Sequence, residues 1–171
     1  VLTHFGFHIE LSPYPSKGLY ELGIESIPSE SVCYPAKLVH GHVKWLLDRG
    51  VKTVFYPGIV YERPDILAAD ESYSCPIVAS YCENIKNNME ELREDGITFL
   101  NPFFSFKNKK ALVRRIASEF AAYGVTRAEA QEAVDLGWKA WDDFREGMHK
   151  KGEEGLAYIK EQNMAAIVLG G

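Results

Sequence analysis

Short apolar runs separated by helix-like stretches are the feature that most constrains the fold of this chain. One further run, 7–11, alternates apolar and polar residues, as a half-buried strand does. This order predicts an α/β fold with a mainly parallel Rossmann-like sheet, flanking helices and a long C-terminal helical segment. We expect the apolar runs to be buried strands at 51–56, 75–79, 97–100 and 164–169.

Capping signals mark where two of the helices should begin. Ser80 is followed by Glu83, and Thr126 by Glu129, which is the spacing of a capping box. Behind the second box, apolar residues recur in steps of four and three. That spacing predicts a long helix with an apolar stripe that continues to Gln162 and forms an arm or a lid.

Composition excludes several classes of partner. The 171 residues are 46% apolar and 25% charged, with a net charge of −5, which is ordinary for a soluble globular protein. No basic run resembles a nucleic-acid footprint, and no apolar run approaches the ~18 residues of a membrane span. We therefore expect one α/β domain over 1–171. The apolar run 164–169 ahead of two glycines suggests a piece of a longer multidomain protein, and a short natural protein with trimmed ends is the alternative.

Three cysteines are too few for a disulfide scaffold, and no signal peptide is visible, so we predict a cytoplasmic, reducing location. Cys33 precedes a predicted helix that has Pro35 in its first turn. A helix N-terminus favours the thiolate, which is the form that binds metals or attacks electrophiles. The spacing from Cys33 to Cys75 and Cys82 matches no common zinc or cluster motif, and buried free cysteine is the alternative.

Polar residues around Cys33 form a candidate substrate site made of Ser31, Lys37 and His40. Lys37 lies in the first turn of the predicted helix, where it could neutralise a phosphate or a thioester carbonyl, or could simply be solvated. His40 and His42 are two residues apart, so on a helix they would point roughly 200° apart. They could not easily bind one metal ion together.

The stretch Ile27-Pro-Ser-Glu-Ser-Val-Cys-Tyr-Pro-Ala-Lys-Leu-Val-His-Gly-His42 closely resembles proteins known as CoA-substrate-specific enzyme activases. These are related to the 2-hydroxyacyl-CoA dehydratases. The resemblance spans nearly the whole chain, and its first motif is long and specific. Further matching segments lie at 54–57, 75–78, 80–81, 84–88, 99–102 and 167–170.

This resemblance implies both a cofactor and partners. The related dehydratase subunits have Rossmann-like lobes and hold a 4Fe–4S cluster through cysteines. The cluster takes one electron from an ATP-dependent activase and passes it to a 2-hydroxyacyl-CoA, which then loses water, a lyase reaction. By resemblance, Cys33 is the first cluster cysteine and Cys75 a further one. An activase module in the same full-length chain and an acyl-CoA are the expected partners.

One position departs from the family pattern. Many relatives have a cysteine directly after the Phe-Tyr-Pro that ends at Pro57, and this chain has Gly58. Cys82 or an external ligand would have to replace that thiolate. Two other hypotheses follow for the domain. It could be a non-catalytic structural or docking module with free thiols, or a metal-free CoA-ester-binding domain that uses Lys37 and helix N-terminal amides.

Overall fold

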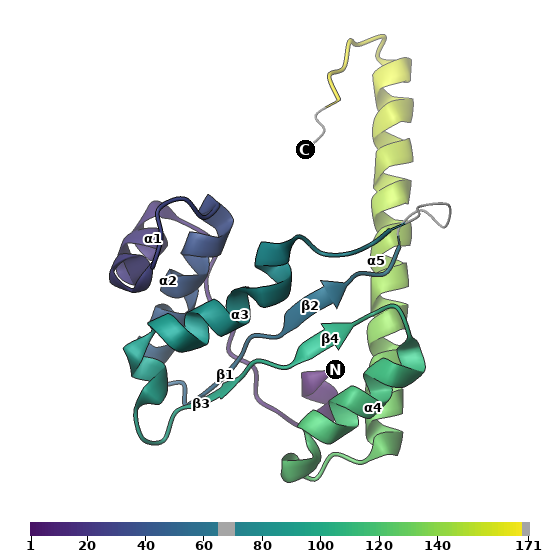
Figure 1. The fold of residues 1–171 in the computed structure, drawn as a ribbon. Helices are drawn as coiled ribbons and strands as arrows, with labels where there is room; N and C mark the ends of the chain where they lie inside the picture. Colours follow the sequence, from purple (N-terminus) through teal and green to yellow (C-terminus); the bar gives the residue numbers. More distant parts are fainter. Residues whose placement is uncertain (65–70, 169–171) are drawn as a thin grey trace.

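The structure is a computed structural model that describes residues 1–64 and 71–168. At its centre is a narrow ribbon of two parallel strand pairs (Figure 1). Strand β1 (Thr53–Phe55) pairs with β3 (Thr98–Leu100), and β2 (Gly58–Tyr61) pairs with β4 (Phe103–Ser105).

Two prolines divide this ribbon into its two pairs. Pro57 and Pro102 lie between the paired segments and have no N–H to donate to a sheet ladder. Backbone bonds continue across the break, from Tyr56 N to Leu100 O (2.9 Å) and from Gly58 N to the carbonyl oxygen of Pro102 (3.0 Å). The chain therefore keeps one strand direction through both pairs.

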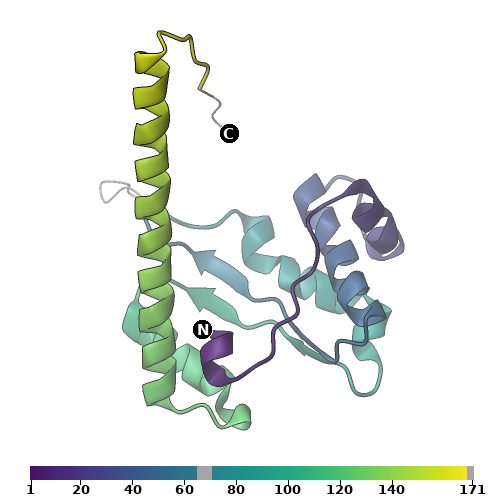
Figure 2. The same cartoon turned by 180° about the vertical axis from the view of Figure 1, so that it is seen from behind.

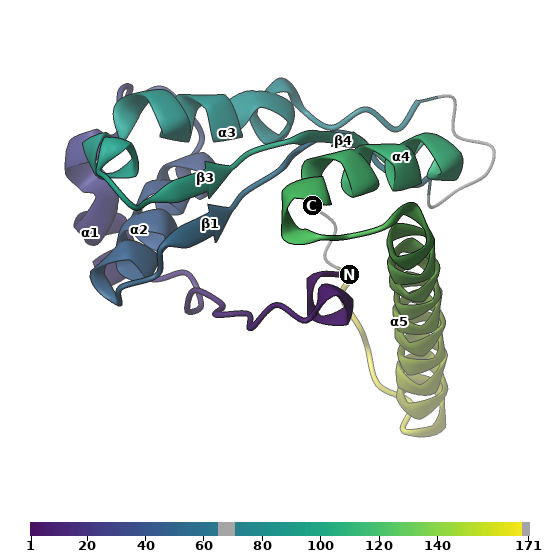
Figure 3. The same ribbon diagram turned by 90° about the horizontal axis from the view of Figure 1, so that it is seen from below.

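Helices surround the ribbon on both sides (Figure 3). Ser16 caps the first α-helix by accepting from Leu19 N, and Asn108 caps the fourth by accepting from Ala111 N. The 3₁₀ helices are η1 (Leu2–Phe5), η2 (Ile24–Ser26), η3 (Glu90–Arg93) and η4 (Ala121–Tyr123). The α-helices are α1 (Lys17–Gly23), α2 (Tyr34–Asp48), α3 (Pro76–Asn88), α4 (Lys109–Glu119) and α5 (Arg127–Glu161).

The pleat of the strands separates two cores. Val54 packs with α2 and α3 in one cluster, whereas the next residue, Phe55, packs with α4 and α5 in the other. Successive side chains of a strand point to opposite faces, so this alternation follows from the backbone. The first cluster contains Ala36, Val43, Val54, Tyr81, Ile85, Met89 and Leu92. The second contains Phe104, Leu112, Val113, Ile116, Phe120, Ala130 and Val134.

Two glycines let α1 and α2 touch through their backbones. A Cβ on Gly41 would lie 1.8 Å from Leu19 O, and one on Gly23 would lie 2.2 Å from Gly41 N. Only glycine leaves room for such an approach. The α1–α2 pair is therefore a fixed unit at one end of the fold.

Several expected elements are confirmed. The runs 51–56 and 97–100 contain β1 and β3, and the sheets are parallel. Thr126 and Glu129 form the expected capping box, and Gln162 is the C-cap of α5. A Rossmann-like sheet is not confirmed, because each sheet in residues 1–64 and 71–168 has two strands. None of the helices in these residues has the length and apolar character needed to span a membrane.

The expected strand at 75–79 is wrong, because this run is the start of α3. Pro76 occupies the first turn, where its missing N–H costs nothing. Ile77, Tyr81 and Ile85 then recur every four residues and face the first core. The expected capping box at Ser80 is wrong for the same reason, since Ser80 lies inside the helix and donates to the Pro76 carbonyl at 2.7 Å.

Two more expected strands are absent from the described residues. The segment 7–11 is irregular and crosses from η1 to α1 (Figure 2). Of the expected strand 164–169, residues 164–168 are also irregular and exposed, with 88% of Ile167 and 90% of Val168 accessible, and Leu169 lies outside the described residues. Both have strand-like composition but no neighbouring strand to pair with, and an isolated extended segment is not stable in water.

Candidate functional site

Cys33 lies at the start of α2, as expected. It is the N-cap residue and is exposed, and its carbonyl accepts from the backbone N–H groups of Ala36 (3.1 Å) and Lys37 (3.3 Å). The Cys33 side chain makes no capping hydrogen bond. Its thiol lies at the positive end of the helix dipole, where Pro35 has no N–H and the N–H groups of Ala36 and Lys37 already donate to Cys33 O.

Cys75 has the same position on α3. It is the exposed N-cap residue of that helix, and its sulfur accepts from Val78 N at 3.4 Å. Its backbone angles are φ −59° and ψ 151°, close to the −60° and 147° of Cys33. Both helices run against the strands, so that their first turns lie toward the carboxyl ends of the strands (Figure 1). The expectation that Cys75 belongs to a buried strand is therefore wrong. Cys33 and Cys75 hold equivalent positions at the starts of two helices that begin on the same side of the fold, which we call the Cys33–Cys75 rim.

Cys82 differs from both of them. It lies within α3 and is 1% exposed. Burial raises the pKa of its thiol, and the nearby charge of Glu83 adds to this effect. The neutral thiol is the weaker metal ligand, so Cys82 is a core residue in this structure.

A 4Fe–4S cluster does not fit the side chains that this structure describes. Clusters are normally held by four cysteine thiolates, and this chain places only Cys33 and Cys75 at an exposed rim. Within residues 1–64 and 71–168, no group of three or more His, Cys, Asp or Glu side chains could hold a metal ion.

His40 is the most buried polar residue in the described core, with 0% exposure. Its Nδ1 is 2.8 Å from Ser26 Oγ, and its Nε2 is 3.0 Å from Tyr81 Oη. Ser26 Oγ already donates to Gly23 O, so it accepts from Nδ1–H, and the Tyr81 hydroxyl donates to Nε2. Burial lowers the pKa of His40 to about 4. His40 is therefore a neutral structural link between η2, α2 and α3.

The tyrosines behind the rim are also held neutral. Burial raises the pKa of Tyr81, and the charge of the nearby Cys33 raises it further. Burial raises the pKa of Tyr56 to about 12, with smaller contributions from Cys82 and Tyr81. Sequence reasoning missed Ser26 and Tyr81 as partners of His40, because they are 14 and 41 residues away and share no local motif with it.

Ser31 and Lys37 lie in and beside the loop before Cys33. The hydroxyls of Ser29 and Ser31 are 2.7 Å apart, and Lys37 Nζ donates to Glu30 O at 3.1 Å. Lys37 also lies 6.0 Å from the centre of the Tyr20 ring. In this structure both side chains hold the loop that presents Cys33. Their predicted role in substrate binding stays a prediction.

Comparison with known proteins identifies the family. The model of the family described as "CoA enzyme activase uncharacterised domain" matches residues 1–171. The chain belongs to this family. A search of curated proteins and a search of solved structures each gave no match.

Gly58 stands at a position where the family resemblance leads us to expect a cysteine. Gly58 is buried where β2 meets α3. A Cβ at this position would lie 2.6 Å from Ala79 O and 2.9 Å from the Phe103 ring. The close packing of α3 against β2 therefore excludes a cysteine side chain here unless the backbone shifts.

The long helix of this family member extends far from the body (Figure 1). Its buried residues are Ala130, Ala133 and Val134, all in its first turns. Beyond them, large apolar side chains are exposed, including Trp141 (42%), Phe144 (62%) and Met148 (58%). Sequence periodicity predicted this stripe, but only the structure shows that, beyond Trp141, no part of the described chain covers it.

Proposed function

We propose that this domain is a docking module of the CoA enzyme activase family, and that α5 is its docking element. One observation carries the proposal. After Val134 no residue of α5 is fully buried, and from Trp141 onward its large apolar side chains are exposed in an apolar stripe. The stripe consists of Trp141, Phe144, Met148 and Leu156.

The helix needs a partner for its stability. Isolated helices gain little from propensity alone, and most helices in proteins are stabilised by packing of an apolar face. Three glycines in its exposed half weaken this helix further, each by about 1 kcal/mol relative to alanine. A Cβ on Gly147, Gly152 or Gly155 would meet no atom within 4 Å, so nothing in the described chain requires glycine there. Glycines at these positions allow a partner to approach the helix backbone closely.

The partner that we propose is the ATP-dependent activase module expected from the family resemblance. Charges of both signs are interspersed along the exposed half of α5, for example in the pairs Lys139–Asp143 and Lys151–Glu154. Steering by net charge is therefore small, and burial of the apolar stripe supplies most of the binding free energy. Binding should depend only weakly on salt concentration.

Calorimetric titration of this domain with a separately produced activase module tests the proposal. We expect saturable binding that weakens at least tenfold when Phe144→Glu and Met148→Glu are combined. Lys150→Glu, on the opposite side of the same helix, should bind like the wild type. Circular dichroism should show equal helix content in both variants. Absence of binding by the wild type, or dimerisation of the domain alone through this stripe, would overturn the assignment of the partner.

We make a second proposal, which concerns cluster binding at Cys33 and Cys75. Cys33 and Cys75 are at most two of the ligands that a cluster needs, so cluster binding in this family requires further thiolates from outside this chain. Anaerobic reconstitution of the domain alone should give no stoichiometric iron and sulfide, whereas reconstitution together with a partner that supplies the further thiolates should. A complete cluster on the isolated domain would contradict this proposal.

A further inference from the structure

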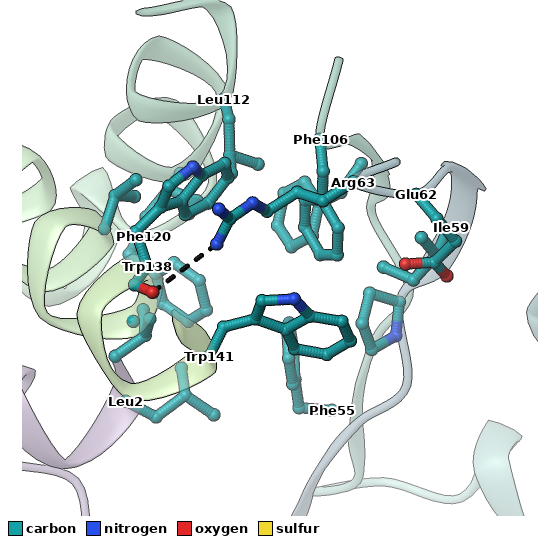
Figure 4. A pocket seen from close by; sticks show the side chains of 16 residues that line it. Leu2, Phe55, Ile59, Glu62, Arg63, Phe106, Leu112, Phe120, Trp138 and Trp141 are labelled. Carbon is teal, nitrogen blue, oxygen red and sulfur yellow. Dashed lines mark hydrogen bonds between the residues drawn. The ribbon is translucent and has the colours of Figure 1, made fainter. Parts of the chain in front are cut away.

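A cavity lies between the ribbon, α4 and the first half of α5, on the far side of the strands from α3. Its volume is about 250 Å³. Six aromatic rings from strands and helices line the cavity, together with aliphatic side chains (Figure 4). These rings belong to Phe55, Phe104, Phe106, Phe120, Trp138 and Trp141.

The cavity opens to solvent on one side, and its volume exceeds that of the voids in an ordinary protein core. Protein interiors are close-packed and contain few voids larger than a water molecule. An apolar cavity of about 150 Å³ stays dry and is large enough to bind benzene. The volume here therefore fits an apolar group of about ten non-hydrogen atoms.

A glycine on α5 leaves part of this space open. Gly137 lines the cavity in the middle of the helix, where glycine is destabilising. The nearest atom to a Cβ on Gly137 would be Val1 Cγ2, at 3.3 Å. Any larger side chain at this position would occupy the cavity.

In the part of the chain that the structure describes, Arg63 is the one cationic side chain in the wall, and its neighbour Glu62 is the one acidic side chain there. Arg63 follows β2 and reaches across to α5 (Figure 4), with its guanidinium 5.2 Å from the centre of the Trp138 ring. It donates to Asp142 Oδ1 at 2.7 Å and, more weakly, to Trp138 O at 3.4 Å. Among the described residues, these bonds use two of its five N–H groups.

Another anion can replace Asp142 as the partner of Arg63 at little cost in free energy. The Asp142 side chain is 56% exposed, and an ion pair with such an exposed partner contributes at most about tenfold to an equilibrium. Arginine binds carboxylates bidentately through its planar fork. A carboxylate at the mouth of the cavity could therefore use the remaining N–H groups or replace Asp142.

We propose that this cavity binds an apolar monocarboxylic acid of about ten carbons, with the hydrocarbon between the aromatic rings and the carboxylate on Arg63. The site is separate from the Cys33–Cys75 rim and from the exposed stripe of α5 beyond Trp141. It does not depend on the docking function.

Titration with decanoate below its micelle concentration tests the site through tryptophan fluorescence, because Trp138 and Trp141 line the cavity. We expect saturable binding by the wild type. Gly137→Leu should abolish binding by filling the cavity, while its melting temperature stays equal or rises. Arg63→Met should weaken binding of decanoate about tenfold and leave binding of decanol unchanged.

Arg49 offers a matched control, because it also stacks on a tryptophan (Trp45, 4.7 Å) and pairs with an acid (Glu10, 3.1 Å), away from the cavity. Arg49→Met should bind decanoate like the wild type. No saturable binding by the wild type, or undiminished binding by Gly137→Leu, would overturn the site. Equal loss in the two arginine variants would overturn the role of Arg63. Phe144→Glu should not affect decanoate binding, which separates this test from that of docking.

Discussion

Tyr81 Oη and His40 Nε2 lie 3.0 Å apart and join α3 to α2 through the core behind the Cys33 rim. Their rings meet edge to face at 81°, with centres 5.6 Å apart. Ser26 completes the chain on the other side of the imidazole. A buried polar network of this kind is costly when one member is missing, which gives the first prediction.

Tyr81→Phe should destabilise the domain by about 1–3 kcal/mol, because it leaves the buried Nε2 of His40 without a donor. Urea denaturation measures the change in the free energy of unfolding. Tyr14→Phe is the matched control, since Tyr14 is 95% exposed and should change stability little. Equal stability of the wild type and Tyr81→Phe would contradict the assigned hydrogen bond.

Stability should fall as the pH is lowered from about 6.5 to about 4, because His40 titrates near 6.5 when unfolded and at about 4 when folded. The unfolded chain binds the proton first, so the contribution of His40 is complete above pH 6.5 and lost below pH 4. The shift corresponds to roughly 3 kcal/mol. His40→Gln should show a shallower decrease over this range in urea denaturation. An unchanged slope would rule out His40 as the titrating group.

Alanine substitutions at two glycines should have opposite effects. Gly58→Ala should destabilise by about 1–3 kcal/mol, because its Cβ would lie 2.6 Å from Ala79 O. Gly147→Ala should stabilise by up to about 1 kcal/mol, since it lies in an exposed helix with open space around it. Thermal denaturation compares the two variants. If Gly58→Ala is tolerated, packing is not what keeps cysteine out of this position.

The three cysteines should react with iodoacetamide in two classes. Cys33 and Cys75 are exposed N-cap residues and should be alkylated quickly, whereas the buried Cys82, whose pKa is raised, should react only after unfolding. Mass spectrometry of a time course, native and in urea, measures the rates. Rapid alkylation of Cys82 in the native state would show that α3 opens or that its packing differs.

Helix boundaries could be predicted well where local chemistry decides them. Thr126 and Glu129 satisfy each other's backbone and side-chain groups within one turn, so the signal lies entirely in neighbouring residues. The apolar run that begins at Cys75 was wrongly predicted to be a strand, because its local signal is ambiguous. A short apolar run is compatible with a strand or a buried helix, and here Pro76 and the four-residue spacing of Ile77, Tyr81 and Ile85 decide for the helix.

The sequence by itself determined the strands β1 and β3, their parallel direction, the long C-terminal helix and the place of Cys33 at a helix start. Each of these depends on periodicity or capping within a few residues. Only the tertiary structure decided that Tyr81 satisfies His40, that Ala79 excludes a side chain at Gly58, and that Arg63 lies over an aromatic cavity. These relationships join residues 21 to 79 positions apart. Contacts at such separations are set by how the elements pack, and no local pattern encodes them.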